Sequence, residues 1–190
     1  MERSRCGWAT SAPEYLRYHD EEWGTPLHGD DALYERLTLE AFQSGLSWIT
    51  VLRKRPAFRA AFAGFSIEAV AAFTAEDEAR LLADPGIVRN RAKVRAAVVN
   101  ARAALAVPGG LSALLWSFAP TDPRPRPRTL ADVPATSPES TALARELKRR
   151  GFGFVGPTTG YALMQATGMV DDHVATCFRA GPGGGAAGPG

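Results

Sequence analysis

Glu40 is the acidic side chain that the sequence places best for chemistry. It lies in LEAFQSGLSW, positions 39–48, with apolar residues on both sides. On a helical wheel Glu40 falls with Arg36 and Gln43 in a wedge between two apolar stripes. That wedge faces either solvent or a pocket, because carboxylates are seldom fully buried without a partner. In a pocket, Glu40 would accept hydrogen bonds and carry a charge.

A turn and an aromatic ring follow this carboxylate. Gly45 should end the helix at a point where backbone could come close to a ligand, because glycine adopts conformations that other residues avoid. Ser47 can cap a second helix that begins at Trp48. We therefore expect the Glu40 carboxylate and the Trp48 indole to meet across this turn.

Both cysteines and two of the histidines form a possible metal site. His173 and Cys177 are four residues apart, so on a helix they would project from one face, a usual spacing for two ligands of one zinc ion. Cys6 and His19 would complete a tetrahedral Cys₂His₂ set and tie the N-terminal segment to the last helix. Unrelated thiols and histidines are the alternative, because this spacing is not that of a standard zinc finger. The remaining histidine, His28, stands apart from this set.

Basic residues gather after a tight turn near the middle of the chain. Positions 84–88, DPGIV, form a turn of the kind that Pro and Gly impose, and it joins two expected helices into a hairpin. Like charges four residues apart would disfavour the second helix if it stood alone. Free N–H groups at its start could bind a phosphate, whereas a solvated basic face is the alternative. The residues concerned are Gly86, Arg89, Arg91, Lys93 and Arg95.

Four aromatic residues cluster in the first thirty positions, a segment with little regular periodicity. Disordered segments lack aromatic residues, so we expect this one to pack onto the domain. Its rings either fill core or line a cleft. They are Trp8, Tyr15, Tyr18 and Trp23.

The elements that would position these residues belong to one domain. The chain has 190 residues, 45% hydrophobic and 22% charged, with a net charge of +2. This length suits a single globular domain, and the net charge alone does not indicate nucleic acid. No apolar run is long enough to span a bilayer, and the N-terminus lacks a secretory signal. We therefore expect a cytoplasmic, non-membrane protein without a structural disulfide.

Helical patterns dominate, and no convincing strand pattern is present. Pro56 should end the helix that starts at Ser47, and Ser66, Thr74 with Asp77, and Ser137 are expected N-caps. Residues 119–136 are too rich in Pro to form a helix or central strand, and 179–190 should be a disordered Gly/Pro/Ala tail. Asp30 or Asp31 should cap the Glu40 helix. The other helices are expected near 57–62, 66–73, 74–83, 90–107, 111–118, 137–150, 159–167 and in the segment VDDHVATC.

Taken together, these segments resemble the type I 3-methyladenine DNA glycosylases. The resemblance lies in RCGW, YHDEEWG, LEAFQSGLSWITVLRKR, KRRGFGFVG and DDHVATC, and it covers positions 1–178. It implies an all-α fold of the helix-hairpin-helix glycosylase superfamily in a single domain over 1–178. It also implies a structural zinc ion at Cys6, His19, His173 and Cys177, which joins the two ends of the chain.

The resemblance also implies roles for the other candidate residues. Glu40, as the catalytic residue, would hold the extruded base together with Trp48 and Tyr18, while Trp8 and Trp23 match the other aromatic positions of the family. Leu46 would contact or fill the duplex where the base has left. Gly86, Arg89, Arg91 and Lys93 would contact DNA. The hairpin lacks the Gly-x-Gly usual in the superfamily, so its grip on phosphate should be shallower or differently made.

The implied reaction is hydrolysis of the N-glycosidic bond of 3-methyladenine in double-stranded DNA by a monomer. Neither a nucleophilic lysine nor the usual catalytic aspartate of the superfamily has a counterpart, which favours a monofunctional enzyme without a lyase step. A non-catalytic DNA-binding module would use the hairpin but has no use for a carboxylate beside aromatic rings. A zinc hydrolase does not fit, because four protein ligands leave no position for water.

Overall fold

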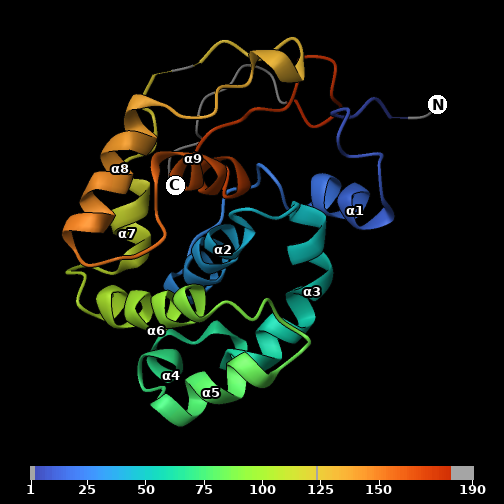
Figure 1. Ribbon diagram of the computed structural model, residues 1–190. Helices are drawn as coiled ribbons and strands as arrows, with labels where there is room; N and C mark the ends of the chain where they lie inside the picture. Colours follow the sequence, from blue (N-terminus) through green and yellow to red (C-terminus); the bar gives the residue numbers. More distant parts are fainter. Residues whose placement is uncertain (1–2, 123, 181–190) are drawn as a thin grey trace.

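The computed structural model describes residues 3–122 and 124–180, and within these ranges it contains helices and no strand (Figure 1). The predicted all-α fold is confirmed. None of the described helices is both long and apolar enough to cross a bilayer. The predicted tail at 179–190 lies, from 181 on, outside the described residues. The helices are α1 (Pro13–Glu21), α2 (Asp30–Gln43), α3 (Trp48–Ala61), η1 (Ala63–Phe65), α4 (Ile67–Ala71), α5 (Ala75–Ala83), α6 (Arg91–Leu105), α7 (Leu111–Trp116), η2 (Leu130–Asp132), α8 (Pro138–Arg149) and α9 (Pro157–Ala166).

Helix α2 forms the centre of the molecule. Figure 1 shows it surrounded by α3, α6, α7 and α9, and it packs against all four. Every residue from 33 to 42 is buried, polar side chains included. Leu33, Leu37 and Leu39 lie in the main hydrophobic core. Because a buried charge is costly unless it is paired, the polar residues of α2 must find partners inside the protein. They form the ion pairs and the pocket wall described below.

The two aspartates at the start of α2 cap other helices. The prediction that Asp30 or Asp31 caps α2 itself is wrong, because Gly29 occupies the N-cap position. Asp30 Oδ1 instead accepts a hydrogen bond of 2.7 Å from Ser112 N in α7, and Asp31 Oδ1 accepts one of 2.9 Å from Ile67 N in α4. These bonds satisfy free N–H groups of neighbouring helices and fix α2 relative to them.

The predicted end of α3 is also wrong. Pro56 lies inside this helix, which continues to Ala61 and absorbs the short helix expected at 57–62. The predicted caps fare better, since Ser66 Oγ accepts from Ala69 N and Thr74 forms a capping box with Asp77. Ser137 caps α8 in the same way. Tertiary packing therefore overrides the proline signal, whereas these three capping signals hold.

The two ends of the chain differ from the sequence prediction. Helix α1 was not predicted, although Pro13 at its first position is a usual start signal. The segment carrying His173 and Cys177 forms turns instead of the predicted helix. The ends lie side by side, because Phe178 N donates to Ser4 O at 2.8 Å.

Candidate active site and metal centre

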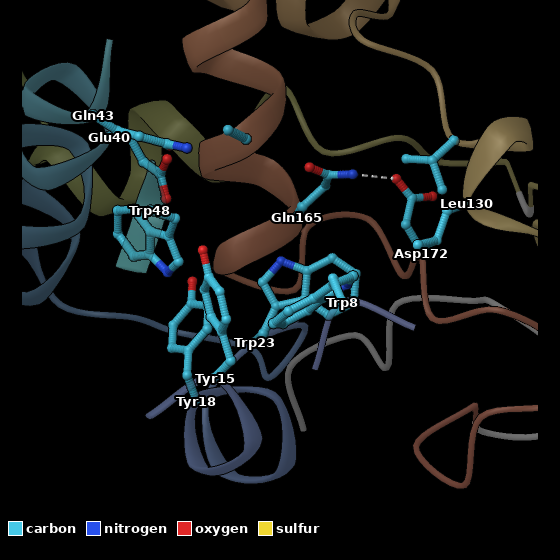
Figure 2. A pocket seen from close by; sticks show the side chains of 12 residues that line it. Trp8, Tyr15, Tyr18, Trp23, Glu40, Gln43, Trp48, Leu130, Gln165 and Asp172 are labelled. Atoms are coloured by element: carbon cyan, nitrogen blue, oxygen red, sulfur yellow. Dashed lines mark hydrogen bonds between the residues drawn. The ribbon is translucent and has the colours of Figure 1, made fainter. Parts of the chain in front are cut away.

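A cavity of about 410 Å³ lies beside α2, between the N-terminal segment and α9 (Figure 2). It brings the four N-terminal aromatic residues together with Glu40 and Trp48, which come later in the chain. All four N-terminal aromatic residues line this cavity, although Tyr18 is also buried. The residues that line the cavity are Trp8, Tyr15, Tyr18, Trp23, Glu40, Gln43, Trp48, Leu130, Val133, Ala162, Gln165 and Asp172.

Glu40 and Asp172 are the two buried acidic residues of this cavity, and they differ in their hydrogen bonds. Glu40 is 6% exposed, and no group among residues 3–122 and 124–180 donates a hydrogen bond to its carboxylate. Burial raises the pKa of Glu40 to about 7, an effect that the nearby Arg36 charge partly opposes. A buried carboxylate without a protein donor is costly for stability, so its lone pairs are available to a ligand.

Two aromatic side chains stand next to this carboxylate. The ring centroids of Tyr18 and Trp48 are 5.5 Å apart, and the two planes are tilted by 49°. Trp48 Nε1 is buried without a hydrogen-bond partner in the described part of the chain. The cavity wall therefore carries a free acceptor at Glu40 and a free donor at Trp48, a combination typical of a site for a flat polar ligand.

The other N-terminal rings form a continuous aromatic wall. Trp8 packs edge-to-face against both Tyr15 and Trp23, with centroids 5.6 and 5.2 Å apart. The Tyr15 hydroxyl accepts a hydrogen bond of 2.9 Å from Ile49 N, at the start of α3. The family resemblance implies no role in base binding for Tyr15, but its place in α1, one turn before Tyr18, puts it in the same wall.

The opposite side of the cavity comes from the C-terminal third of the chain. Asp172 Oδ2 accepts hydrogen bonds from Tyr161 Oη at 2.7 Å and from Gln165 Nε2 at 2.8 Å, and Figure 2 shows the second of these. Leu130, in the Pro-rich segment, also lines this side. None of these residues was singled out in the sequence, and only the i,i+4 spacing of Tyr161 and Gln165 on α9 hints at a shared face.

The four predicted metal ligands do come together. Cys6, His19, His173 and Cys177 are all buried, and one ligand atom from each lies within 4.8 Å of the others. Cys177 Sγ lies 3.3 Å from His19 Nε2 and 3.6 Å from His173 Nδ1. Two sulfurs and two imidazole nitrogens at such separations suit one tetrahedral ion.

The surroundings of this cluster fit a metal as well. His19 Nδ1 pairs with Asp20 Oδ1 at 2.9 Å, and His173 Nε2 lies 3.2 Å from the Trp23 carbonyl oxygen. Each ring therefore presents its other nitrogen to the cluster, the arrangement that metal-binding histidines usually show. Gly24 has φ +74°, and a Cβ there would lie 2.9 Å from His173 Nε2, so only glycine fits behind this ring.

The residues predicted to contact DNA fall into two groups. Leu46, Arg89 and Arg91 are exposed, as a surface contact requires. Lys93 is buried, and its Nζ donates to the carbonyl oxygens of Phe42, at 2.9 Å, and of Ser44. The phosphate contact predicted for Lys93 stays a prediction, and the structure gives its ammonium group a second role, because it satisfies two carbonyls at the end of α2.

Gly86 likewise has an internal role. Its N–H donates to Asp84 Oδ1 at 2.7 Å, while its carbonyl accepts from Lys54 Nζ at 3.2 Å. A Cβ at this position would lie 3.0 Å from Ala57 Cβ, so the glycine lets the turn approach α3. The hairpin of α5 and α6 is present as predicted, but the N–H group of Gly86 is occupied.

Comparison with known proteins agrees with this geometry. Residues 8–180 match the methyladenine glycosylase family. The chain is 45% identical over 177 residues to DNA-3-methyladenine glycosylase 1 of Escherichia coli strain K12, covering 91% of this chain and 95% of that protein. A crystal structure of 3-methyladenine DNA glycosylase I superposes with a TM-score of 0.89 at 44% identity, covering 93% of this chain and 99% of that one. The Staphylococcus aureus enzyme, solved to show 3-methyladenine recognition, gives 0.86 at 38% identity, covering 91% and 94%.

Proposed function

Since the chain belongs to the methyladenine glycosylase family, we propose that its aromatic cavity holds 3-methyladenine extruded from alkylated DNA. The chain is a DNA-3-methyladenine glycosylase, which hydrolyses N-glycosidic bonds and removes alkylated bases in base excision repair. The observation that carries the placement of the base is the buried Glu40 carboxylate, which lacks a protein hydrogen-bond donor and lies beside Trp48 and Tyr18.

Base extrusion precedes the chemistry. A base inside a duplex is inaccessible, and rotating it out costs a few kcal/mol, least where damage has weakened pairing or stacking. The exposed Leu46, on the turn between α2 and α3, is suited to occupy the space that the base leaves. Arg89 and Arg91 would hold the phosphates near the hairpin. Double-stranded DNA is thus the proposed partner, bound by a monomer.

The pocket distinguishes the damaged base by its charge. 3-Methyladenine attached to deoxyribose is cationic, so stacking on Trp48 gains a cation–π contribution of about 0.5 to 2 kcal/mol. Ionised Glu40 accepts hydrogen bonds from the amino edge of the base and attracts its charge. Neutral adenine lacks the charge-dependent part of both interactions.

The same charge simplifies the chemistry. A cationic base is a good leaving group, so the bond to the sugar breaks with less acid–base assistance than a neutral base requires. Ionised Glu40 stabilises the positive charge that develops on the sugar as the base leaves. Water adds to the sugar carbon, the free base departs, and an abasic site remains without strand cleavage.

A structural zinc ion is the metal that the Cys₂His₂ cluster suits best. The buried cluster can hold a metal, and two thiolates with two imidazoles favour zinc in a closed site. Such an ion would join the N-terminal segment, with its pocket aromatics, to the C-terminal segment. It takes no part in the reaction, because four protein ligands leave no position for substrate or water.

One experiment tests the placement of the base and its recognition together. Purified protein is incubated with a methylated duplex, the released bases are separated by chromatography, and wild type is compared with Trp48→Ala. We expect wild type to release 3-methyladenine and the variant to lose base binding, seen also as loss of inhibition by free 3-methyladenine. Undiminished inhibition of Trp48→Ala by the free base would contradict the proposed pocket. Cytoplasmic location stays a prediction from the sequence.

A further inference from the structure

Arg36 is a buried cation that lies against the base cavity without lining it. It is 4% exposed and precedes Glu40 by about one turn of α2. Its NH1 donates to the Tyr18 hydroxyl oxygen at 3.2 Å, and its NH2 donates to Glu22 Oε2 at 3.0 Å. The guanidinium carbon also lies 5.3 Å from the centroid of the Tyr18 ring. Two hydrogen bonds and a ring contact therefore fix this guanidinium.

The bond from Arg36 determines what the Tyr18 hydroxyl can do. A guanidinium only donates hydrogen bonds, so the Tyr18 oxygen must accept and its own proton must point elsewhere. Tyr18 lines the cavity, and Figure 2 shows its hydroxyl directed toward Glu40 and Trp48. The hydroxyl proton is thus available for donation on the cavity side, where the base and the carboxylate would meet.

A network of ion pairs anchors Arg36 from behind. Arg55 NH1 donates to the same Glu22 oxygen at 2.6 Å, and Arg55 Nε donates to Glu35 Oε1 at 2.6 Å. Arg59 Nε, at the exposed end of the network, donates to Glu35 at 2.9 Å. Three guanidinium groups face two carboxylates here, which leaves one positive charge. An ionised Glu40 offsets that charge.

Few other charges face Glu40. Tyr15 and Tyr18 face it from α1 and Trp48 from α3, all uncharged at neutral pH, while Gln43 adds a neutral amide from α2. Across the cavity, Asp172 is engaged by Tyr161 and Gln165. In the described chain, Arg36 supplies the positive charge that acts on Glu40, and it lowers the pKa that burial raises.

We propose that Arg36 is a positioning residue for base excision: its bond to the Tyr18 hydroxyl turns the hydroxyl proton toward the cavity, and its charge, about one turn before Glu40 on α2, favours the carboxylate form of Glu40. The effect of Arg36 on catalysis rests on the proposed function, whereas the effect of Arg36 on the ionisation of Glu40 is independent of it. Arg36 is a cation near a site for a cationic base, but its NH2 is paired with Glu22 and neither residue lines the cavity. Its charge therefore acts on the Glu40 carboxylate without contacting the base.

The first measurement needs no substrate. Protein labelled with ¹³C at its glutamate carboxyls is titrated by NMR, and Glu40→Gln identifies the Glu40 signal by its loss. In Arg36→Met we expect the Glu40 midpoint to rise by about 1 unit, because an opposite charge about one helical turn away is lost. Arg36→Lys keeps the charge and should stay near wild type. Arg59→Met is the matched control, and it should leave the midpoint unchanged.

The second measurement follows excision of 3-methyladenine across pH under single-turnover conditions. In Arg36→Met the acid limb should move up by the same amount as the NMR midpoint, with the rate recovering at higher pH. Because Arg36→Met also releases the Tyr18 hydroxyl, its excision rate should stay below that of wild type even at high pH. In a Tyr18→Phe background, Arg36→Met should cause no such loss at high pH, because no hydroxyl remains to be positioned. Arg36→Lys should restore the pH profile but not the rate lost at high pH.

Defined outcomes would overturn the proposal. An unchanged Glu40 midpoint in Arg36→Met and an equal loss of rate at every pH would show that Arg36 only supports the fold. Arg36→Lys provides the test if Arg36→Met does not fold. A rise of about 1 unit in the Glu40 midpoint of Arg36→Lys, which keeps the charge, would reject the electrostatic role. If Arg36→Met shifts the Glu40 midpoint but Glu40→Gln excises 3-methyladenine at the wild-type rate, only the proposed catalytic role of Glu40 is rejected.

Discussion

Burial of Glu40 opposes its ionisation, whereas recognition of a cationic base requires it. Replacing the carboxylate by the amide in Glu40→Gln keeps the shape but removes the charge. We predict that excision of 3-methyladenine falls about ten- to a hundredfold, since a hydrogen bond to a charged group contributes about 1.5 to 3 kcal/mol. Single-turnover excision on a methylated duplex measures the loss, and fluorescence anisotropy should show unchanged DNA binding. Wild-type excision by this variant would make Glu40 a structural residue.

The same substitution should change stability in a pH-dependent way. The folded-state pKa of Glu40, about 7, lies above its ordinary value of 4.5, so the folded protein binds the extra proton between these values. The wild type therefore loses stability as pH rises from about 4.5 to 7, and Glu40→Gln does not. We expect the variant to gain on the order of 2 kcal/mol relative to wild type between pH 5 and pH 8.

Urea unfolding of both proteins at the two pH values measures this gain. Glu21→Gln, an exposed position of α1, is the control and should show none. An equal difference between wild type and Glu40→Gln at both pH values would mean that the buried carboxyl does not titrate in this range.

Sequence reasoning found only part of the site at the scale of residues. Glu40 and Trp48 lie close together in one segment, so pattern and spacing bring them to the same turn. Gln165 and Asp172 were missed, because their contact with the cavity depends on how the C-terminal third of the chain folds back. Arg36 was placed beside Glu40 by the helical wheel, but the bond to Tyr18 needs the position of α1, which was not predicted.

At the scale of elements, the hairpin of α5 and α6 separates two kinds of basic residue. Arg89 is exposed at its tip, whereas Lys93 hydrogen-bonds the carbonyl oxygens at the end of α2. We predict that Arg89→Ala weakens binding to all DNA sequences alike and reduces the salt dependence by about one phosphate contact. Anisotropy titrations at several salt concentrations measure both. A change in the base that is excised would contradict this placement.

Lys93→Met should act on the fold instead. Burial lowers the pKa of Lys93, yet its ammonium group satisfies two carbonyls next to the turn that carries Leu46. Removing it leaves these carbonyls unpaired, at a cost of about 1 to 3 kcal/mol in unfolding free energy. Urea unfolding measures the cost. A reduced salt slope of DNA binding with unchanged stability would restore Lys93 as a phosphate contact.

Local signals predicted the elements better than long-range ones. The capping residues Ser66, Thr74 and Ser137 begin helices as expected, because their hydrogen bonds involve only the next three residues. The segment that holds His173 and Cys177 was predicted as a helix, on which their spacing would bring both to one face. A turn satisfies the same requirement, since Cys177 N bonds back to Val174 O and brings the two ligands to one cluster.

At the scale of the whole molecule, the pocket depends on contacts between the ends of the chain. Periodicity and capping residues predict the all-α class. The contact between the N-terminal and C-terminal segments is predicted only by the four candidate ligands and the family resemblance. Trp8 and Trp23, which line the pocket, pack against this cluster in a small hydrophobic group separate from the main core. So few apolar contacts support only a weak attachment of the N-terminal segment, and a bound metal would supply the rest.

Metal removal should therefore unfold this part of the molecule first. We predict about one zinc ion per chain in purified protein, and loss of the metal in Cys177→Ala together with lower stability of the joined ends. Metal analysis gives the stoichiometry, and hydrogen exchange should show increased exchange in the N-terminal segment while α2 stays protected. Ser4→Ala, at a described exposed position next to the cluster, is the control and should retain both metal and protection. Folded, active protein without metal would show that packing alone holds the two ends together. The four side chains of the cluster would then contact one another without a metal.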